Sequence, residues 1–423
     1  MNFIHPTDFK ESTRHKKIET APLPKKVIIP LSQHTGAPSE PIVKAGDLVQ
    51  RGSLIGRSKG FISANLHSSI SGKVVAIDDK IGISIESDGQ DKREFSGTCR
   101  DVSDLSSKEI IDIVKEAGIV GLGGAAFPTH VKLSPPPGKK IDTLIINGAE
   151  CEPFLSCDHR MMLERPKEIL LGIGLIAKVL GVKDVIVGIE ENKLDAIEAL
   201  GSALFSDKGQ GTRDKVRVIG LKTRYPQGGE KQLIKVLLNR EVPSGGLPLD
   251  IGCVVSNVQT VFSIYEAVYF GKPLYERVVT VAGNFLKEPK NILARIGTPI
   301  KDLLESCGFN EKADVYKIIM GGPMTGAAQY SLDVPIVKGT SGVLVLGKEF
   351  EAGAELDCIR CGRCIDGCPA GLMPCMIGIG VQNNRFDIAS SYEPGDCIEC
   401  GACGYVCPSK IPLMQLIKLA KKR

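Results

Sequence analysis

The sequence predicts a multidomain protein of mixed α/β and α+β class, and three observations support this prediction. Its 423 residues exceed what a single hydrophobic core usually serves, which indicates about three or four domains. Helical and strand patterns alternate between residues 104 and 270, as in an α/β layer, whereas residues 26–95 contain short β-rich runs between glycine turns. Two closely spaced groups of cysteines follow beyond residue 350, so a further domain there is expected to use thiol chemistry.

Composition narrows the classes of function. The net charge of +4 is spread along the chain, and the absence of Trp, with only 5% aromatic residues, argues against a nucleic-acid-binding surface. Fourteen cysteines without a recognisable secretory leader indicate a reducing compartment, where thiolates bind metal rather than pair. No segment is apolar enough over a sufficient length to predict a transmembrane helix.

The N-terminal part is expected to be β-rich. Residues 1–30 are polar and proline-containing, which predicts an extended arm. In residues 31–100, the half-motifs EPIVKAGDLVQRGSLIG and HSSISGKVVAI resemble a lipoyl- or biotinyl-type barrel-sandwich hammerhead. The setting of Lys59 does not resemble an attachment site for a swinging arm, so a structural scaffold is favoured. Strand patterns fall at Lys26–Leu31, Lys73–Ile77 and Gly82–Glu86.

Residues 104–272 are predicted to form an α/β domain. Its first helix, Ser107–Ala117, has a capping box made by Ser106 and Glu109 and stops at Gly118. A G-x-G-x-x-A pattern at 172–177 lies inside a helical period with no strand before it, so it is not expected to bind a dinucleotide. Strands are expected at Thr143–Ile146, Asp184–Ile189 and Lys215–Ile219.

The C-terminal cysteines twice follow the spacing C-x2-C-x2-C-x3-C, each time with a proline next. In two-cluster ferredoxins with this spacing, the fourth cysteine of each motif ligates the other cluster. The rule predicts two crossed [4Fe-4S] ligand sets, one made by Cys358, Cys361, Cys364 and Cys407 and the other by Cys397, Cys400, Cys403 and Cys368. Zinc is the alternative, but zinc sites generally pair two distant C-x2-C knuckles. The helical stretch between the motifs favours an all-helical ferredoxin domain at 350–418. Cys375 is near enough to be an additional ligand.

A glycine-rich loop follows the first helix of the α/β domain. Gly121, Gly123 and Gly124 would let backbone N–H groups approach a phosphate or a ring face, and Lys132 would add positive charge for a phosphate. A tight structural turn is the alternative. The next predicted strand ends in Asn147-Gly-Ala-Glu-Cys-Glu-Pro153, at the sheet edge where ligands of open α/β sheets gather.

These segments resemble a known family. GLGGAAFPTHVK and INGAECEP are similar to the flavin- and NADH-binding subunit of respiratory complex I, and TRYPQGGEKQLI and SNVQTVFSIYEAV follow in that family's order. The segment VVTVAGNFLKEPKNILARIGTPIKDLLESCG resembles a soluble-ligand-binding β-grasp module, expected over 275–347. Together with the arm, the segment IPLSQHTGAPSEP, the motif IMGGPMTG and the two cysteine motifs, the arrangement resembles the C subunit of the Rnf complex.

The resemblance implies specific contacts. Phe127 would stack against the nicotinamide end of NADH, and Glu152 would bind its ribose. Leu122 and Ala149 depart from the complex I pattern, which has an arginine and an aspartate there, and this difference separates subfamilies. The implied FMN contacts are Gly121, Gly123, Gly124, Lys132, Asn147, Glu150, Tyr225, Gly228, Glu230 and Asn257.

The function implied is electron transfer between NAD(H), FMN and two [4Fe-4S] clusters in a membrane-bound, ion-translocating NAD:ferredoxin oxidoreductase. The chain would be a peripheral subunit on the cytoplasmic face, with the other subunits as partners, ferredoxin as an indirect one, and the arm and the cluster domain as docking surfaces. Two alternatives remain at this level. One is a soluble paralogue that delivers NADH electrons to a cytosolic reductase, and the other is a cluster-bearing scaffold without flavin.

Overall fold

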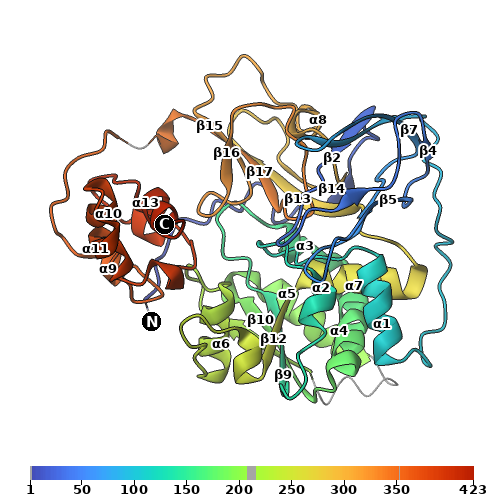
Figure 1. The fold of residues 1–423 in the computed structure, drawn as a ribbon, viewed down its shortest axis with the longest axis horizontal. Coiled ribbons are helices and arrows are strands. Elements are labelled where there is room, and N and C mark those ends of the chain that lie inside the picture. The colour runs from blue at the N-terminus through green and yellow to red at the C-terminus, as the bar shows by residue number, and fades with distance from the viewer. Residues whose placement is uncertain (1, 207–215, 352) are drawn as a thin grey trace.

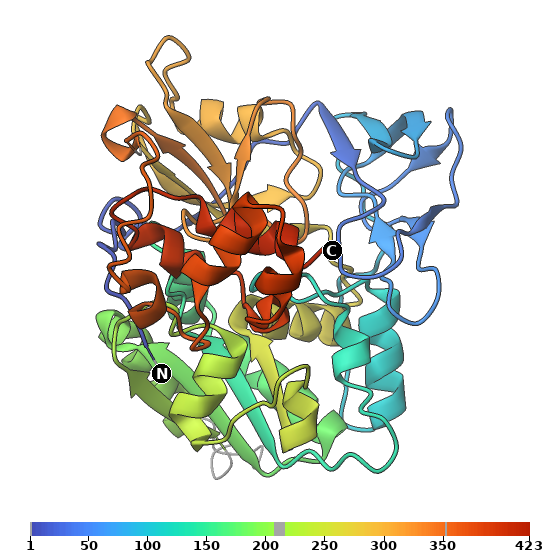
Figure 2. The ribbon, with the colours of Figure 1, turned by 60° about the vertical axis from the view of Figure 1, so that its left-hand side comes forward.

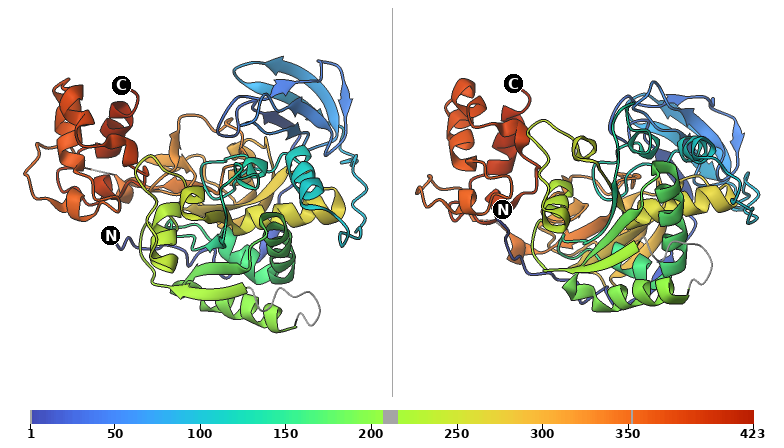
Figure 3. Two further views of the ribbon diagram at one scale, coloured as in Figure 1. Left: turned by 60° about the horizontal axis from the view of Figure 1, so that its bottom comes forward. Right: turned by 90° about the horizontal axis from the view of Figure 1, so that it is seen from below.

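A computed structural model describes residues 2–206, 216–351 and 353–423. Four parts follow one another in the chain: a β-rich barrel sandwich, an α/β domain, a β-grasp domain and a small helical domain (Figure 1). The helical domain and the barrel sandwich lie at opposite ends of the molecule (Figure 3). In the turned view, the helical domain lies in front of the junction between the α/β and β-grasp domains (Figure 2).

The barrel sandwich consists of two small sheets around an aliphatic core. One sheet has the order β2-β8-β7-β4 and the other β3-β5-β6, and all their pairings are antiparallel. Alternate residues of the paired strands β2 and β8, including Val27, Ile29, Ile83 and Ile85, are buried in the core. Lys59 forms an exposed ion pair with Glu40 at 2.6 Å. The strands are β2 Lys26–Ile29, β3 Glu40–Pro41, β4 Leu48–Val49, β5 Leu54–Arg57, β6 Leu66–His67, β7 Gly72–Asp78 and β8 Gly82–Ser87.

The α/β domain has a four-stranded parallel sheet in the order β11-β10-β9-β12. The sheet is buried on both faces, because Leu144 and Ile146 pack with α1, α4, α5 and α7 while Ile145 packs with α6. Its elements are α1 Ser107–Glu116, α2 Thr129–Lys132, β9 Thr143–Gly148, α3 Cys157–Glu164, α4 Pro166–Leu180, β10 Asp184–Glu190, η1 Glu191–Lys193, α5 Leu194–Ser206, β11 Val216–Leu221, α6 Glu230–Leu238, η2 Pro248–Ile251, β12 Cys253–Asn257 and α7 Val258–Phe270.

The β-grasp domain has a six-stranded mixed sheet in the order β1-β14-β13-β17-β15-β16. Strand β1, Ile18–Thr20, comes from the N-terminal arm and pairs in parallel with β14, so Ile18 lies opposite Asn291. The segment 1–30, predicted to be an extended arm, contains turns at residues 11–15, and its last part, Lys26–Ile29, is strand β2 of the barrel sandwich. Much of this segment is bound to the chain's own domains rather than free for docking. The other elements are β13 Glu276–Gly283, β14 Lys290–Arg295, α8 Ile300–Ser306, β15 Lys317–Met320, β16 Ala327–Gln329, β17 Gly342–Leu346 and the short turn η3 Lys348–Phe350.

The helical domain is built from two similar halves. The register that aligns Cys358 with Cys397 also aligns α9 with α12 and α10 with α13. The backbone repeats too, because Arg360 and Glu399 both have φ of 56°, and Gly362 and Gly401 have φ of 75° and 76°. The elements are α9 Arg363–Asp366, α10 Pro374–Gln382, α11 Phe386–Ser390, η4 Pro394–Asp396, α12 Ala402–Tyr405 and α13 Leu413–Ala420.

Most elements expected from the sequence are present. The capping box of α1 is formed, since the Ser106 hydroxyl accepts from the Glu109 N–H and the Glu109 carboxylate accepts from the Ser106 N–H. The predicted strand at Lys215–Ile219 is β11, although Lys215 itself lies outside the described residues. Within residues 2–206, 216–351 and 353–423, no helix has the length and apolar character needed to cross a bilayer.

The glycine pattern at 172–177 lies within α4, as expected, and has a packing role there. A Cβ on Gly172 would lie 2.4 Å from the carbonyl oxygen of Val261 in α7. The glycine therefore allows the two helix backbones to approach each other.

We predict opposite effects for two helix glycines. Gly172→Ala should destabilise the protein by about 1–3 kcal/mol, because its methyl group overpacks the contact with α7. Gly201→Ala in α5 is the matched control, since nothing lies within 4 Å of the added Cβ, and it should stabilise by about 0.5–1 kcal/mol. Denaturant unfolding monitored by circular dichroism measures both. Equal effects of the two substitutions would contradict the packing role.

Candidate functional site

A cavity of about 650 Å³ opens at the carboxyl ends of β9 and β12. Parallel strands direct their carboxyl ends to one edge of a sheet, where ligands of such folds bind. Eleven of the twelve residues predicted to bind flavin or NADH line the cavity: Gly121, Gly123, Gly124, Phe127, Lys132, Asn147, Glu152, Tyr225, Gly228, Glu230 and Asn257. The glycine loop, both strand ends and the segment before α6 therefore come together.

The glycine loop forms one wall of the cavity. Gly124 has a φ of +145°, a conformation that favours glycine, and no atom lies within 4 Å of the position where a Cβ would be. The loop is fixed from behind, because the Leu122 N–H donates to the Thr260 hydroxyl at 2.8 Å. Leu122, which stands where the complex I pattern has an arginine, is buried, and its side chain is part of the hydrophobic core. The loop thus offers an open backbone surface on a fixed support.

Two asparagines mark adjacent strand ends. Asn147 in β9 is paired with Asn257 in β12, and both side chains are engaged by the surrounding backbone or side chains. The Asn147 amide donates to the Gly228 carbonyl at 2.8 Å, which fixes the segment before α6. The Asn257 oxygen caps α7 by accepting from the Gln259 N–H, and its amide donates to Asp158 at 2.6 Å. These amides hold the rim of the cavity in place.

Lys132 supplies the positive charge that the sequence suggested. Its ammonium group donates to Glu230 at 2.6 Å and to the Val255 carbonyl at 3.0 Å, and its side chain is 33% exposed. A phosphate entering the cavity would meet a fixed but accessible cation. A flavin phosphate contact by Lys132 stays a prediction, and the structure places its ammonium group at the cavity.

Glu150 is the exception among the predicted residues, because it does not line the cavity. Its carboxylate accepts from the N–H groups of Asp158 and His159, at 2.7 and 3.2 Å, at the start of α3. Ser156, the residue before α3, makes no side-chain cap, so Glu150 fulfils that role from a distance. The flavin contact predicted for Glu150 stays a prediction, and in the structure its carboxylate binds the first turn of α3.

Glu152 is bound by a loop of the β-grasp domain. Its partly buried carboxylate accepts from the Met324 N–H at 3.0 Å and from the Thr325 hydroxyl at 2.5 Å, and desolvation raises its pKa. The loop carries the motif IMGGPMTG, to which the sequence alone assigned no role. A contact from Glu152 to NADH stays a prediction, and the structure adds that this carboxylate joins two domains at the cavity.

Tyr225 connects the cavity with three other segments. Its backbone forms a bridge with Ile4 of the arm, with two N–H···O hydrogen bonds whose N···O distances are 2.9 and 2.8 Å. Its buried hydroxyl donates to the Cys400 carbonyl at 2.6 Å. Cys151, which sequence reasoning left out of the site, lies beside it and accepts from the Gly228 N–H through its sulfur. Tyr225 thus lies between the cavity and the second cysteine motif.

The eight motif cysteines form two separate groups. Cys358, Cys361, Cys364 and Cys407 line one cavity, of about 260 Å³, which we call the outer set. Cys368, Cys397, Cys400 and Cys403 line the other, which we call the inner set. The fourth cysteine of each motif is thus placed with the other motif, as in the crossed arrangement. Four thiols line each cavity, which is the number of ligands of a [4Fe-4S] cluster, and in the inner set the Leu372 and Glu399 N–H groups donate to the Cys368 and Cys397 sulfurs at 3.4 Å.

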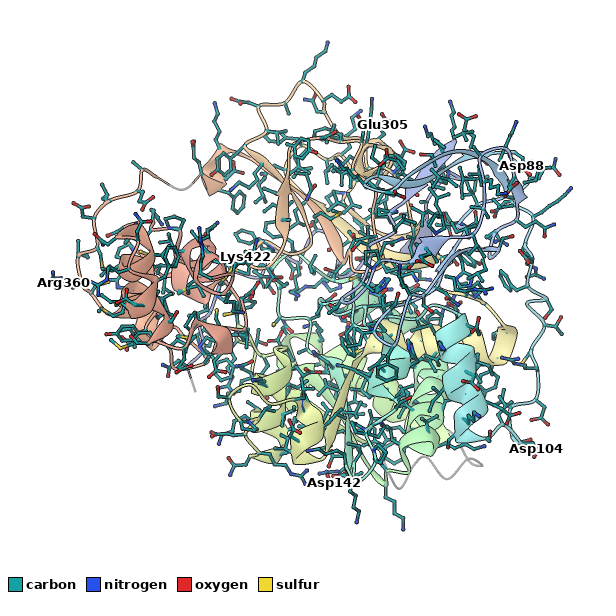
Figure 4. The ribbon with its side chains drawn as sticks, in the orientation of Figure 1. Asp88, Asp104, Asp142, Glu305, Arg360 and Lys422 are labelled. Carbon is teal, nitrogen blue, oxygen red and sulfur yellow. The ribbon has the colours of Figure 1, made fainter. Side chains whose placement is uncertain are left out.

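The inner set borders the cavity that the glycine loop lines. Ile398, Glu399, Cys400 and Lys418 belong to the helical domain, yet they line the cavity with the glycine loop. The residues lining the outer set's cavity all come from the helical domain itself. Ile359, the counterpart of Ile398, is 68% exposed, and neighbouring Arg360 extends away from the rest of the molecule (Figure 4). The inner set therefore lies next to the cavity, and the outer set lies farther from it and faces solvent.

Comparisons with known proteins agree with this architecture. Family models match in four places: the RnfC barrel sandwich hybrid domain at 2–88, the Nuo51 FMN-binding domain at 114–266, the SLBB domain at 278–328 and the 4Fe-4S dicluster domain at 357–411. The chain also resembles one chain of a solved NAD+-reducing [NiFe]-hydrogenase, with a TM-score of 0.51 and 19% identity over 74% of this chain and 62% of that one. At that identity the likeness concerns the fold alone.

Curated relatives are much more similar. The chain is 52% identical over 396 residues to the C subunit of the proton-translocating ferredoxin:NAD(+) oxidoreductase complex of Clostridium ljungdahlii, covering 91% of this chain and 85% of the relative. It is 44% identical over 432 residues to the C subunit of the Na(+)-translocating complex of Acetobacterium woodii, covering 99% and 95%. With this identity over nearly the full length of both relatives, the chain belongs to the family of C subunits of Rnf-type ion-translocating ferredoxin:NAD(+) oxidoreductase complexes.

Proposed function

We propose that this protein is the NAD(H)-facing electron-transfer subunit of a membrane-bound, ion-translocating ferredoxin:NAD oxidoreductase. It would pass electrons between NAD(H), FMN and two [4Fe-4S] clusters. One observation carries the proposal: a single cavity is lined by the glycine loop and by the segment around Cys400. A flavin held by that loop would adjoin a cluster held by the inner set. The names of the two relatives support the same activity.

The residues have separable tasks in this proposal. When bound, FMN would supply the exchange between two-electron and one-electron chemistry. Gly121, Gly123 and Gly124 would allow the cofactor to approach the backbone, and Lys132 would bind its phosphate. Asn147, Tyr225, Gly228, Glu230 and Asn257 would complete the flavin contacts, while Phe127 and Glu152 would position NAD(H).

The outer set would connect the subunit with a partner. The exposed surface around Ile359 and Arg360 is where a redox partner would come nearest to the outer cluster. We place the subunit peripherally on the cytoplasmic face of the membrane, bound through other subunits of the complex. The relatives' translocating complexes favour this over a soluble paralogue, and the cavity next to the inner set favours it over a scaffold without flavin.

Anaerobically prepared protein should contain about eight iron and eight acid-labile sulfide per chain. Cys361→Ser should reduce the iron to about four, because Cys361 belongs to the outer set alone. Cys99→Ser is the matched control, since Cys99 is also exposed but lies outside both sets. Iron and sulfide analysis measures all three proteins. Zinc in place of iron, or equal loss in both variants, would contradict the cluster assignment.

Lys132→Met should weaken FMN binding by about ten- to a hundredfold, which corresponds to losing a charged hydrogen bond of about 1.5–3 kcal/mol. Lys139→Met is the control, because Lys139 forms a similar pair with Asp250, at 2.8 Å, outside the cavity. Flavin fluorescence titration of the apoprotein gives both affinities. An unchanged affinity for the Lys132 variant would show that the phosphate lies elsewhere.

Ile359→Glu should weaken docking of the electron partner by at least about tenfold, because a charge would enter an apolar contact. NADH-dependent reduction of a small artificial acceptor should stay unchanged. Leu48→Glu, on the exposed surface of the barrel sandwich, is the control. Electron delivery to the other subunits in membranes is the measurement. Full delivery by the Ile359 variant would place the docking surface elsewhere.

A further inference from the structure

The barrel sandwich contacts the glycine loop directly. The hydroxyl of Thr35, in the segment IPLSQHTGAPSEP, donates to the Ala125 carbonyl at 2.7 Å. The backbone N–H of the same residue donates to the Ala126 carbonyl at 3.3 Å. The residues predicted to bind flavin or NADH all lie between positions 121 and 257, so none of them belongs to the barrel sandwich. One residue of that domain nevertheless holds two consecutive carbonyls of the loop.

The loop needs such support, because open space lies on two sides of it. Gly124, Ala125 and Ala126 line the cavity at the strand ends and also line a second cavity, of about 430 Å³, which Thr35 borders. Ala126 has a φ of 49°, in the left-handed region that alanine seldom adopts. A segment in that conformation between two cavities keeps its shape only where other groups bind it.

Carbonyls of the loop are bound by other domains, whereas N–H groups of the same peptide units are not bound. The Leu122 carbonyl accepts from the Arg277 guanidinium of the β-grasp domain at 3.3 Å, and the Ala126 carbonyl accepts from the barrel sandwich. Among the residues that the structure describes, the Gly123 and Phe127 N–H groups have no acceptor, and both residues line the cavity at the strand ends. The C=O and N–H of a trans peptide unit point in opposite directions, so holding the carbonyl also orients the N–H.

Thr35 can position the loop because it is itself held in place. The two residues before it are buried. The Gln33 side-chain oxygen accepts from the Lys338 N–H at 3.1 Å, and His34 Nε2 accepts from the Ala64 N–H at 3.1 Å. Thr35 itself is exposed, so its hydroxyl can be removed without opening the hydrophobic core.

We propose that Thr35 is a positioning residue for the flavin, through which the barrel sandwich fixes the shape of the glycine loop. Its two donors hold the Ala125 and Ala126 carbonyls away from the cofactor, and the loop's N–H groups are thereby preorganised for binding. The barrel sandwich then acts as a fixed clamp on the loop rather than as a moving carrier. This inference rests on the proposed function, because it requires FMN in the cavity.

The test is a flavin fluorescence titration of the full-length apoprotein with FMN. Thr35→Val keeps the shape of the side chain but removes the hydroxyl donor, so it should weaken FMN binding by about three- to tenfold. Thr35→Ala removes the same donor and should weaken binding similarly. Thr35→Ser keeps the donor and should retain the affinity of the parent protein.

Thr298→Val is the matched control. The Thr298 hydroxyl also donates to a carbonyl at 2.7 Å, that of Arg295, but it lies outside both cavities. Because Thr298 is more buried than Thr35, a general loss of stability would be at least as large in this control, yet its FMN affinity should stay unchanged.

Three results would overturn the proposal. The first is an unchanged FMN affinity in Thr35→Val and Thr35→Ala. The second is an equal weakening in Thr35→Ser, which would show that the hydroxyl donor is not responsible. The third is an equal weakening in Thr298→Val, since the effect would then reflect stability rather than the loop. A parent protein that binds no FMN would instead refute the proposed function on which the inference rests.

Discussion

The hydrogen bond from the Tyr225 hydroxyl to the Cys400 carbonyl, at 2.6 Å, joins the α/β domain to the helical domain at the point where both reach the cavity. The arm also holds Tyr225 in place, because the backbones of Ile4 and Tyr225 form a bridge. Because electron transfer requires neighbouring cofactors at fixed positions, this junction sets where the inner cluster lies relative to the flavin site. The loop of the β-grasp domain that binds Glu152 closes the same junction from another side.

The helical domain uses one repeated structure in two environments. Ile398 of the inner half packs with Ile4 and Tyr225, whereas its counterpart Ile359 is exposed. A close approach explains part of this difference, since a Cβ on Gly401 would lie 2.5 Å from the Met324 carbonyl, while Gly362 has open space. One half is therefore shaped to fit the rest of the subunit, and the other remains available for a partner.

Local signals allowed much of the structure to be predicted. The capping box at Ser106, the cysteine spacing and the run ending at Asn147 each depend on residues close together in the sequence, and each appears as expected. Long-range contacts were not predictable in this way. Nothing near Glu150 indicates that its carboxylate caps α3, and nothing near Ile18 shows that the arm adds a strand beside Asn291, in a sheet formed much later in the chain. The difference between the inner and outer sets also depends on domain packing rather than on either motif.

The central claim is that electrons pass from the cavity to the inner cluster before they reach the outer one. Rapid-freeze EPR after mixing with NADH tests this directly, using Cys400→Ser to remove the inner cluster and Cys361→Ser to remove the outer. The account predicts that the inner cluster is still reduced promptly in the Cys361 variant, whereas the outer cluster of the Cys400 variant stays oxidised. Equally fast reduction of the outer cluster without the inner one would contradict the account.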